Sequence, residues 1–132
     1  MIKKLFLPVL IILVLSNCSD DSNDKTPNGK CLADALTLTE TDVDDLAPSS
    51  YKAIISFDVK NTSNQDFDMA NGSSAVSLKI EVTTTDDSKY ETIVQLPVAT
   101  ISAGATTSTQ VLVDYGEGKF FESYSITKKY CR

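Results

Sequence analysis

Alternation of apolar and polar residues dominates the chain beyond residue 50. It is clearest in segment 51–60, where alternate positions hold Tyr51, Ala53, Ile55, Phe57 and Val59. The residues between them are polar apart from Ile54. A period of two is that of a β-strand with one buried face, so this segment predicts a half-buried strand.

Similar alternation predicts strands over residues 75–84, 89–96, 107–114 and 120–130, and a weaker first strand over 35–41. A short seventh strand could lie within 67–70. Six to seven half-buried strands with short turns predict an all-β fold, an antiparallel β-sandwich. The faces expected to be buried hold Leu36, Leu38, Val76, Leu78, Ile80, Val82, Tyr90, Val94, Leu96, Thr109, Val111, Val113, Phe120, Tyr124, Ile126 and Tyr130.

Segments 75–84 and 89–96 are expected to form a hairpin whose register follows from their apolar positions. A two-residue loop would pair Val82 with Glu91 and mix buried with exposed faces. A three-residue loop, 85–87, avoids this mixing and therefore predicts an odd loop length. It gives the pairs Val82–Tyr90, Ile80–Thr92, Leu78–Val94 and Val76–Leu96.

Residues 1–17 have the composition of a secretory signal. Lys3 and Lys4 precede an apolar run from Leu5 to Leu15 that only Pro8 interrupts. Because a bilayer span needs about 20 apolar residues, this run is too short to be a good transmembrane helix. We expect residues 1–17 to be a cleaved signal peptide.

The sequence Leu15-Ser16-Asn17-Cys18 resembles the lipobox of bacterial lipoproteins. This resemblance implies that Cys18 becomes the lipidated first residue of the mature protein. Two or more acyl chains hold a protein stably on a membrane, where one chain does not. The alternative is an ordinary cysteine beside a plain signal cleavage site.

An acidic, polar stretch follows Cys18 and cannot bury a core. We interpret residues 18–30 as the lipidated cysteine and a flexible tether. Acidic residues at this place also resemble the export signal of Gram-negative surface lipoproteins. That resemblance implies an outer-membrane protein at the cell surface, and the alternative is the periplasmic face.

Lipidation of Cys18 would leave two of the three cysteines, Cys31 and Cys131, at the limits of a folded domain over 31–132. In an exported protein a disulfide between them is expected, and two unpaired thiols are the alternative. In an up-and-down order of six strands, the first strand starts and the last strand ends at the same end of the sandwich. The bond is then geometrically possible.

The order of turns in 51–130 resembles small immunoglobulin-like domains of bacterial envelope proteins. The resemblance rests on a strand closed by Asn61-Thr62-Ser63-Asn64 and on the turn Ser102-Ala103-Gly104-Ala105 before a later strand. It implies an Ig-like sandwich of six to seven strands, and it implies no activity.

Composition excludes several classes of function. The 132-residue chain has no His, which removes imidazole bases and imidazole metal ligands. Its net charge of −6 argues against a nucleic-acid partner. Paired carboxylates, such as Asp86 and Asp87, could serve a hydrolase if they flanked a cleft, but here we expect solvated turn residues.

Two features predict a binding surface. The segment Tyr115–Phe121 is a glycine-containing hinge that could present Tyr115 or Phe121, unless these rings plug the end of the sandwich. Ile54, Ile93 and Leu112 occupy outward positions and together could form an exposed apolar patch, unless another segment covers them.

Four carboxylates are weak candidates for calcium ligands, and they are Asp42, Asp44, Asp66 and Asp68. Oxygen ligands at alternate positions suit a hard cation, but neither cluster matches the twelve-residue loop pattern. Plain solvated loops are the expected alternative, and we expect no cofactor.

Together these features predict a lipid-anchored, non-enzymatic binding, adhesion or assembly module with an unidentified protein or glycan partner. A glycan-binding accessory protein that uses Tyr115 and Phe121 is the first alternative. A carboxylate-dependent hydrolase is the second.

Overall fold

A computed structural model describes residues 29–132 of the chain. The predicted signal peptide, Cys18 and most of the predicted tether lie outside these residues. The described elements run in the order η1 (Ala33–Ala35), β1 (Leu36–Asp45), β2 (Lys52–Asn61), β3 (Phe67–Asp68), η2 (Met69–Asn71), β4 (Val76–Thr84), β5 (Lys89–Gln95), β6 (Thr100–Ile101), β7 (Thr106–Asp114) and β8 (Phe121–Cys131).

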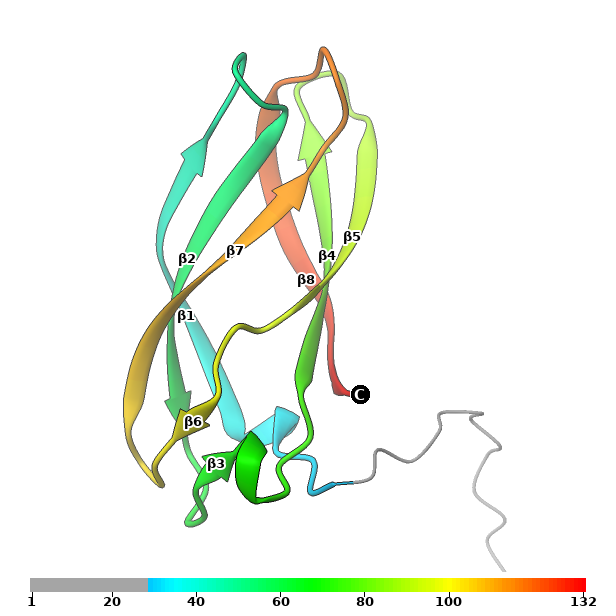
Figure 1. The fold of residues 1–132 in the computed structure, drawn as a ribbon. Coiled ribbons are helices and arrows are strands. Elements are labelled where there is room, and N and C mark those ends of the chain that lie inside the picture. Colours follow the sequence, from blue (N-terminus) through cyan, green and yellow to red (C-terminus); the bar gives the residue numbers. More distant parts are fainter. Residues whose placement is uncertain (1–28) are drawn as a thin grey trace, which may run out of the picture.

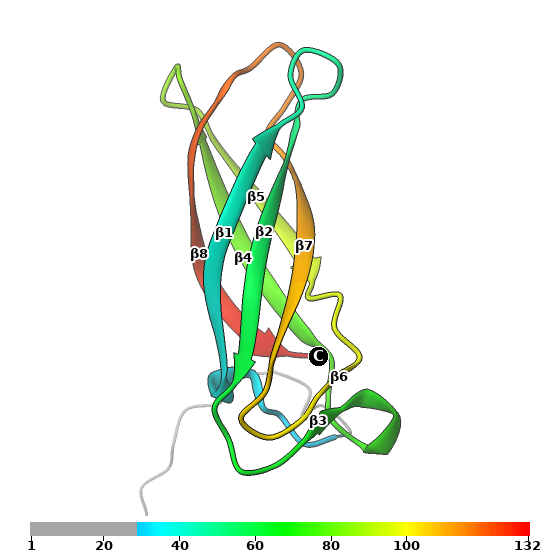
Figure 2. The same cartoon turned by 90° about the vertical axis from the view of Figure 1, so that its left-hand side faces the viewer.

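Six long strands form two antiparallel three-stranded sheets, which confirms the predicted all-β sandwich. One sheet has the order β1-β2-β7 and the other β5-β4-β8. The sheets face each other along the whole length of the molecule (Figures 1 and 2). The seventh strand expected near residue 67 is β3, which pairs with the equally short β6.

The core lies between the sheets and contains the faces that the alternation predicted for the central strands. Alternate residues of β2 and of β4 are buried, and they are Ala53, Ile55, Phe57, Val59, Val76, Leu78, Ile80 and Val82. Val111 and Val113 of β7 are buried in the same cluster. Burying a side chain of this size stabilises the fold by about 1.5–3 kcal/mol.

The hairpin between β4 and β5 has the predicted register. Leu78 is opposite Val94, Ile80 is opposite Thr92 and Val82 is opposite Tyr90. The loop is 85–87, as the three-residue prediction requires. Its last residue, Asp87, has a φ of 62°, the left-handed conformation that closes such a loop.

Strand β1 is longer than the predicted 35–41, because a bulge at Thr41 lets pairing with β2 continue to Asp45. The inward-facing residues of β1 are even-numbered before the bulge and odd-numbered after it. Leu38 and Val43 therefore both pack against the core. Since simple alternation fails across a bulge, the acidic half of β1 was wrongly expected to be a loop.

Strand β8 contains two register shifts, near Glu122 and near Thr127, and both correct the predicted face of 120–130. Tyr124 and Ile126 pack against the core as expected. Phe120 lies before the strand and is 59% exposed, while Phe121 is the partly buried ring. Tyr130 is paired with Ser77 on the outward face, so it was also wrongly assigned to the core.

Cys31 and Cys131 form the expected disulfide, with a Cα–Cα distance of 5.7 Å. Both lie at the end of the sandwich where the described chain begins. Asn61 organises the same end and is fully buried. Its side-chain nitrogen donates to the carbonyls of Gln65 (2.7 Å) and Ile101 (3.0 Å), and its side-chain oxygen accepts from Ser63. Within residues 29–132 no helix could span a membrane.

Candidate binding site

Three loops gather at the end of the sandwich away from the disulfide (Figure 1). They are the β1–β2 connection (46–51), the β4–β5 hairpin loop (85–87) and the β7–β8 loop (115–120). Loops at one end of a sandwich are its usual recognition surface, because the sheets hold them while their sequence is free to vary. The predicted binding residues Tyr115 and Phe121 flank the third loop.

Tyr115 is fully buried, which corrects its assignment as a binding residue. Its ring lies 6.0 Å from that of Phe121, and its hydroxyl donates to the carboxylate of Asp45. Its backbone N–H donates to the carbonyl of Tyr51. Burial, and then the bond to Asp45, raises the pKa of the Tyr115 phenol. Tyr115 therefore joins the β1–β2 connection to the β7–β8 loop from inside.

Phe120 is the aromatic side chain that this loop exposes. The bulge near Glu122 places Phe121 opposite the buried Thr84, and Phe120 then lies outside the strand. The carbonyl of Phe120 accepts from the N–H of Thr85, 3.0 Å away, so the backbone beside the exposed ring is fixed to the hairpin. An anchored backbone under an exposed ring is a suitable arrangement for contact with a partner.

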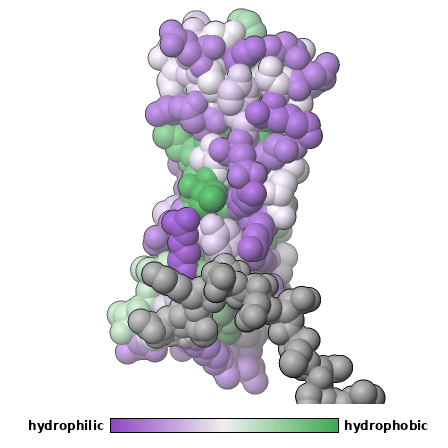
Figure 3. Space-filling model, turned by 90° about the vertical axis from the view of Figure 1, so that its right-hand side faces the viewer, coloured by the Kyte–Doolittle hydropathy of each residue, from purple (hydrophilic) through white to green (hydrophobic). Residues whose placement is uncertain are grey.

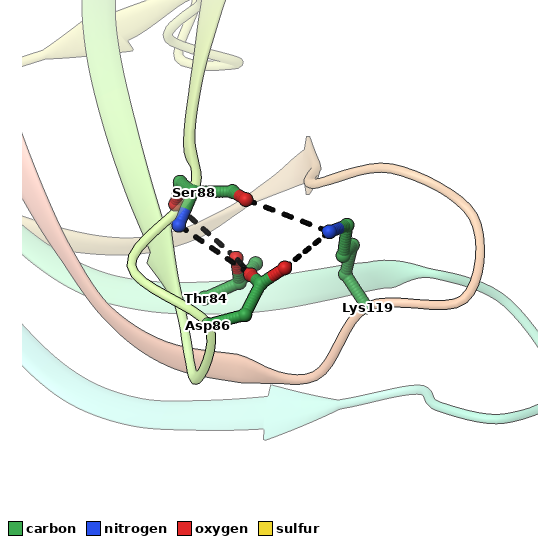
Figure 4. Close-up of polar contacts among 4 residues, drawn as sticks. All are labelled: Thr84, Asp86, Ser88 and Lys119. Atoms are coloured by element: carbon green, nitrogen blue, oxygen red, sulfur yellow. Dashed lines mark hydrogen bonds and ion pairs between the residues drawn. The ribbon is translucent and has the colours of Figure 1, made fainter.

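A polar cluster connects the hairpin loop to the β7–β8 loop (Figure 4). Asp86 accepts hydrogen bonds from the hydroxyl of Thr84 (2.7 Å) and the N–H of Ser88 (3.4 Å). The ammonium of Lys119 reaches across from the other loop and pairs with Asp86. The Lys119 ammonium, followed by the Thr84 hydroxyl, lowers the pKa of Asp86. The ion pair correspondingly raises the pKa of Lys119.

Two glycines shape the β7–β8 loop. Gly116 and Gly118 have φ angles of 90° and 74°, which other residues rarely adopt. At Gly116 a Cβ atom would also lie 2.7 Å from the ring of Tyr90. Glycine is therefore needed at residue 116 both for its conformation and for the close approach of that ring.

The predicted apolar patch is divided between the two sheets. Ile54 and Leu112 are neighbours across β2 and β7, with Leu112 47% exposed. Ile93 is 46% exposed but lies on β5, opposite Lys79, on the outward face of the other sheet. On that side of the molecule hydrophobic areas are small and hydrophilic residues surround them (Figure 3). The three residues do not form one patch, because the sandwich directs its outer faces in opposite directions.

The outward face of β1-β2-β7 carries a shallow polar groove of about 700 Å³. It is lined by Thr41, Asp42, Ser56, Pro97, Ser108, Thr109 and Gln110. Gln110 donates to the hydroxyl of Ser56, 3.1 Å away. Asp42 is the one carboxylate in this lining, so the groove does not bring two acids together.

The calcium candidates are dispersed, and two of them, Asp66 and Asp68, accept hydrogen bonds. Asp42 and Asp44 point outward from β1. Asp66 accepts from the N–H of Ala103 at 2.7 Å, and Asp68 caps η2 through the N–H groups of Ala70 and Asn71. Among residues 29–132, no three His, Cys, Asp or Glu side chains are grouped so that they could hold a metal ion.

No protein-family model, curated protein or solved structure matches this chain. The resemblances to bacterial lipoproteins and to Ig-like envelope domains therefore stay predictions from the sequence.

Sequence reasoning missed Phe120 as the exposed ring, although one signal was available. Adjacent strand residues face opposite sides, so only one of Phe120 and Phe121 could point inward. The ion pair between Asp86 and Lys119 had no signal in the sequence, since the two residues come from different loops.

Proposed function

We propose that this protein is a lipid-anchored cell-envelope protein whose sandwich acts as a non-enzymatic binding module. The anchor rests on the signal-like residues 1–17 and the lipobox-like Cys18. The described chain begins at Gly29, at the end opposite the three loops (Figure 1). An anchor at Cys18 would therefore hold the domain with its loops facing away from the membrane.

The observation that carries the binding role is the exposed Phe120 on an anchored loop. The loop is tied from inside by Tyr115 and from outside by Lys119. A loop already held in one conformation loses little entropy when it binds, which favours affinity. Phe120 supplies the apolar contact, and the charged pair beside it supplies polar rim contacts.

The two alternatives receive less support. A glycan site built on Tyr115 and Phe121 loses its first ring to burial, although the exposed Phe120 could stack on a sugar. A hydrolase needs two carboxylates across a cleft, and the groove on the β1-β2-β7 sheet is lined by one.

A capture experiment tests the binding role. The anchored protein is cross-linked to its neighbours on intact cells, and the captured proteins and glycans are identified. We expect Phe120→Ala to lose the specific partner. Met69→Ala is the matched control, because Met69 is also exposed but lies on η2 at the opposite end. Equal capture by both variants would contradict the loop site.

The membrane anchor has a separate test. Cys18→Ser should abolish lipid-dependent processing and move the protein from the detergent phase to the aqueous phase. Unchanged partitioning would contradict lipidation. Protease treatment of whole cells then separates the proposed surface location from the periplasmic alternative, since only a surface protein is digested before lysis.

A further inference from the structure

Strand β7 has an unpaired edge that differs from the other three edges of the two three-stranded sheets. β7 pairs with β2 on one side, and in the described part of the chain no strand pairs with it on the other. Its nine residues pair with β2 without a register shift. They include no proline, and the first charged residue is Asp114 at the end.

The other edge strands carry the features that prevent edge-to-edge pairing. β1 has a bulge and four acidic residues, and β8 has two register shifts and adjacent lysines. β5 is seven residues long, contains Lys89 and Glu91, and is followed closely by Pro97. A regular, uncharged edge such as that of β7 is where a further strand is expected to add.

The hydrogen bonds at both ends of β7 identify its unpaired backbone groups. The carbonyl of Ala105 accepts from Asn61, and the N–H of Tyr115 donates to Tyr51. In an antiparallel ladder such bonds recur at every second residue. The odd-numbered residues of β7 therefore bond to β2, and the even-numbered ones direct their backbone groups to the free edge. Consistent with this, the carbonyl of Asp114 accepts from the hydroxyl of Thr92 on β5.

Two side-chain contacts reach this edge from β5 and the chain that follows it. The hydroxyl of Thr92 donates to the carbonyl of Asp114, and the hydroxyl of Thr109 donates to the carbonyl of Pro97, 3.3 Å away. Ser108, Thr109 and Gln110 line the shallow groove, with Pro97 at its border. Ser108, Gln110 and Leu112 are all exposed. The unpaired backbone groups of the even-numbered residues can accept an extended chain by strand addition.

We propose that the free edge of β7 pairs antiparallel with β7 of a second copy of this chain, across a two-fold axis at Gln110. Gln110 is the middle residue of the strand, so this register pairs all nine residues. The two Gln110 side chains meet as amide groups, each of which can donate and accept. Leu112 meets the small Ser108 of the second copy, and Asp114 meets an uncharged threonine, Thr106. No like charges are opposed.

Antiparallel pairing also defines the direction of the two molecules. β7 runs from the end where the described chain begins toward the loop end (Figure 2). A two-fold axis at Gln110 therefore places the two N-terminal ends at opposite ends of the dimer. If the proposed anchor at Cys18 holds, the dimer connects two facing membranes, which makes the protein a homophilic adhesion module.

Disulfide trapping tests the strand pairing independently of the anchor. Directly opposed residues in a hydrogen-bonded antiparallel pair have Cα atoms about 5.5 Å apart, a distance that a disulfide can span. The full chain carrying Gln110→Cys should give a covalent dimer under mild oxidation. Gln95→Cys is the matched control, since Gln95 is an exposed glutamine on the β5 edge, and it should stay monomeric.

If Gln110→Cys gives no more covalent dimer than Gln95→Cys, the β7 dimer is overturned, whatever the location of the protein. If Gln110→Cys on intact cells forms disulfides only with other envelope proteins, a second copy of this chain is not the partner of β7.

Vesicle clustering tests the adhesion geometry. Phosphatidylcholine vesicles that carry the purified lipidated chain should cluster, as measured by light scattering. Gln110→Pro should abolish clustering, because it removes an N–H of the free edge and leaves the bonds to β2 intact. Gln110→Lys, which keeps the backbone N–H, should weaken it by charge repulsion across the axis. The thermal unfolding of both variants is compared with that of the wild type, so that a loss of clustering is not caused by unfolding.

If Gln110→Cys forms covalent dimers but the vesicles do not cluster, the strand pairing stands and adhesion between membranes is overturned. Clustering that Gln110→Pro and Gln110→Lys leave unchanged overturns the role of β7.

Discussion

The two ends of the sandwich are held by different kinds of interaction. The end where the described chain begins is closed by the Cys31–Cys131 disulfide and by the buried amide of Asn61. The loop end is held by polar contacts, several of them exposed, such as the pair between Asp86 and Lys119. Tyr115 extends the core into that end, where Phe121 packs against it.

This difference separates stability from recognition. Covalent and buried interactions contribute most to folding, whereas exposed ion pairs contribute little. A recognition surface needs exposed side chains such as Phe120, and those cannot also be buried in the core. The exposed side chains of the loop end are therefore expected to tolerate substitution better than the buried groups of the opposite end.

The largest effect is expected from loss of the disulfide. Cys31→Ser combined with Cys131→Ser opens a loop with a sequence separation of 100 residues. It should lower the free energy of unfolding by about 2–5 kcal/mol. Denaturant unfolding of the oxidised wild type, the reduced wild type and the variant measures the loss. Equal stability of all three would show that the disulfide does not stabilise this end.

The second effect concerns Asn61, whose buried amide satisfies two carbonyls. Asn61→Ala leaves those groups without their donor and should cost about 1–3 kcal/mol. Asn64→Ala is the control, because Asn64 is exposed in the same loop. Equal melting temperatures for the two variants would contradict an organising role for Asn61.

The third effect is at the loop end, where Tyr115→Phe removes the bond to Asp45. A loss of about 1 kcal/mol is expected, smaller than at the opposite end. Folding raises the pKa of the phenol, so its stabilisation is complete below pH 10 and is lost as the pH rises above that value. Tyr115→Phe should therefore unfold less steeply with alkali than the wild type.

A second phenol, that of Tyr124, also contributes to the alkaline unfolding profile and must be separated from that of Tyr115. Burial, and then the bond to Glu40, also raises the pKa of its phenol. Tyr124→Phe should remove a separate part of the alkaline dependence. If neither variant changes the alkaline unfolding profile, the two phenols are not responsible for it.

The smallest effect on stability is expected for the exposed pair. Because folding lowers the pKa of Asp86, its contribution is complete above about pH 4 and disappears as the pH falls further. Lys119→Ala should reduce this acid dependence, and the small stabilisation that the pair provides is then lost at neutral pH as well. A large loss at neutral pH would mean that the loop end depends on this pair more than its exposure suggests.

Much of the fold was predictable because regular strands repeat one simple rule. The alternation in β2 and β4 identified their buried faces, and the apolar positions of the hairpin required the loop at 85–87. The pairing of Cys31 with Cys131 was expected from the cysteine count, and the even number of long strands made it geometrically possible.

The candidate site was less predictable because bulges interrupt that rule. A single extra residue near Glu122 exchanged the roles of Phe120 and Phe121, and the bulge at Thr41 turned a predicted acidic loop into a strand. The unpaired edge of β7 became visible only when its neighbours in the sheet were known.

The sequence by itself determined the class of fold, the central buried faces and the cysteines that pair, because these depend on local periodicity and on cysteine count. Tertiary structure alone decided which ring of Phe120-Phe121 is exposed, that Tyr115 is buried against Asp45, and which edge strand stays unpaired. The physical reason is that strand order and bulge positions arise from contacts between distant segments, and no local pattern records them.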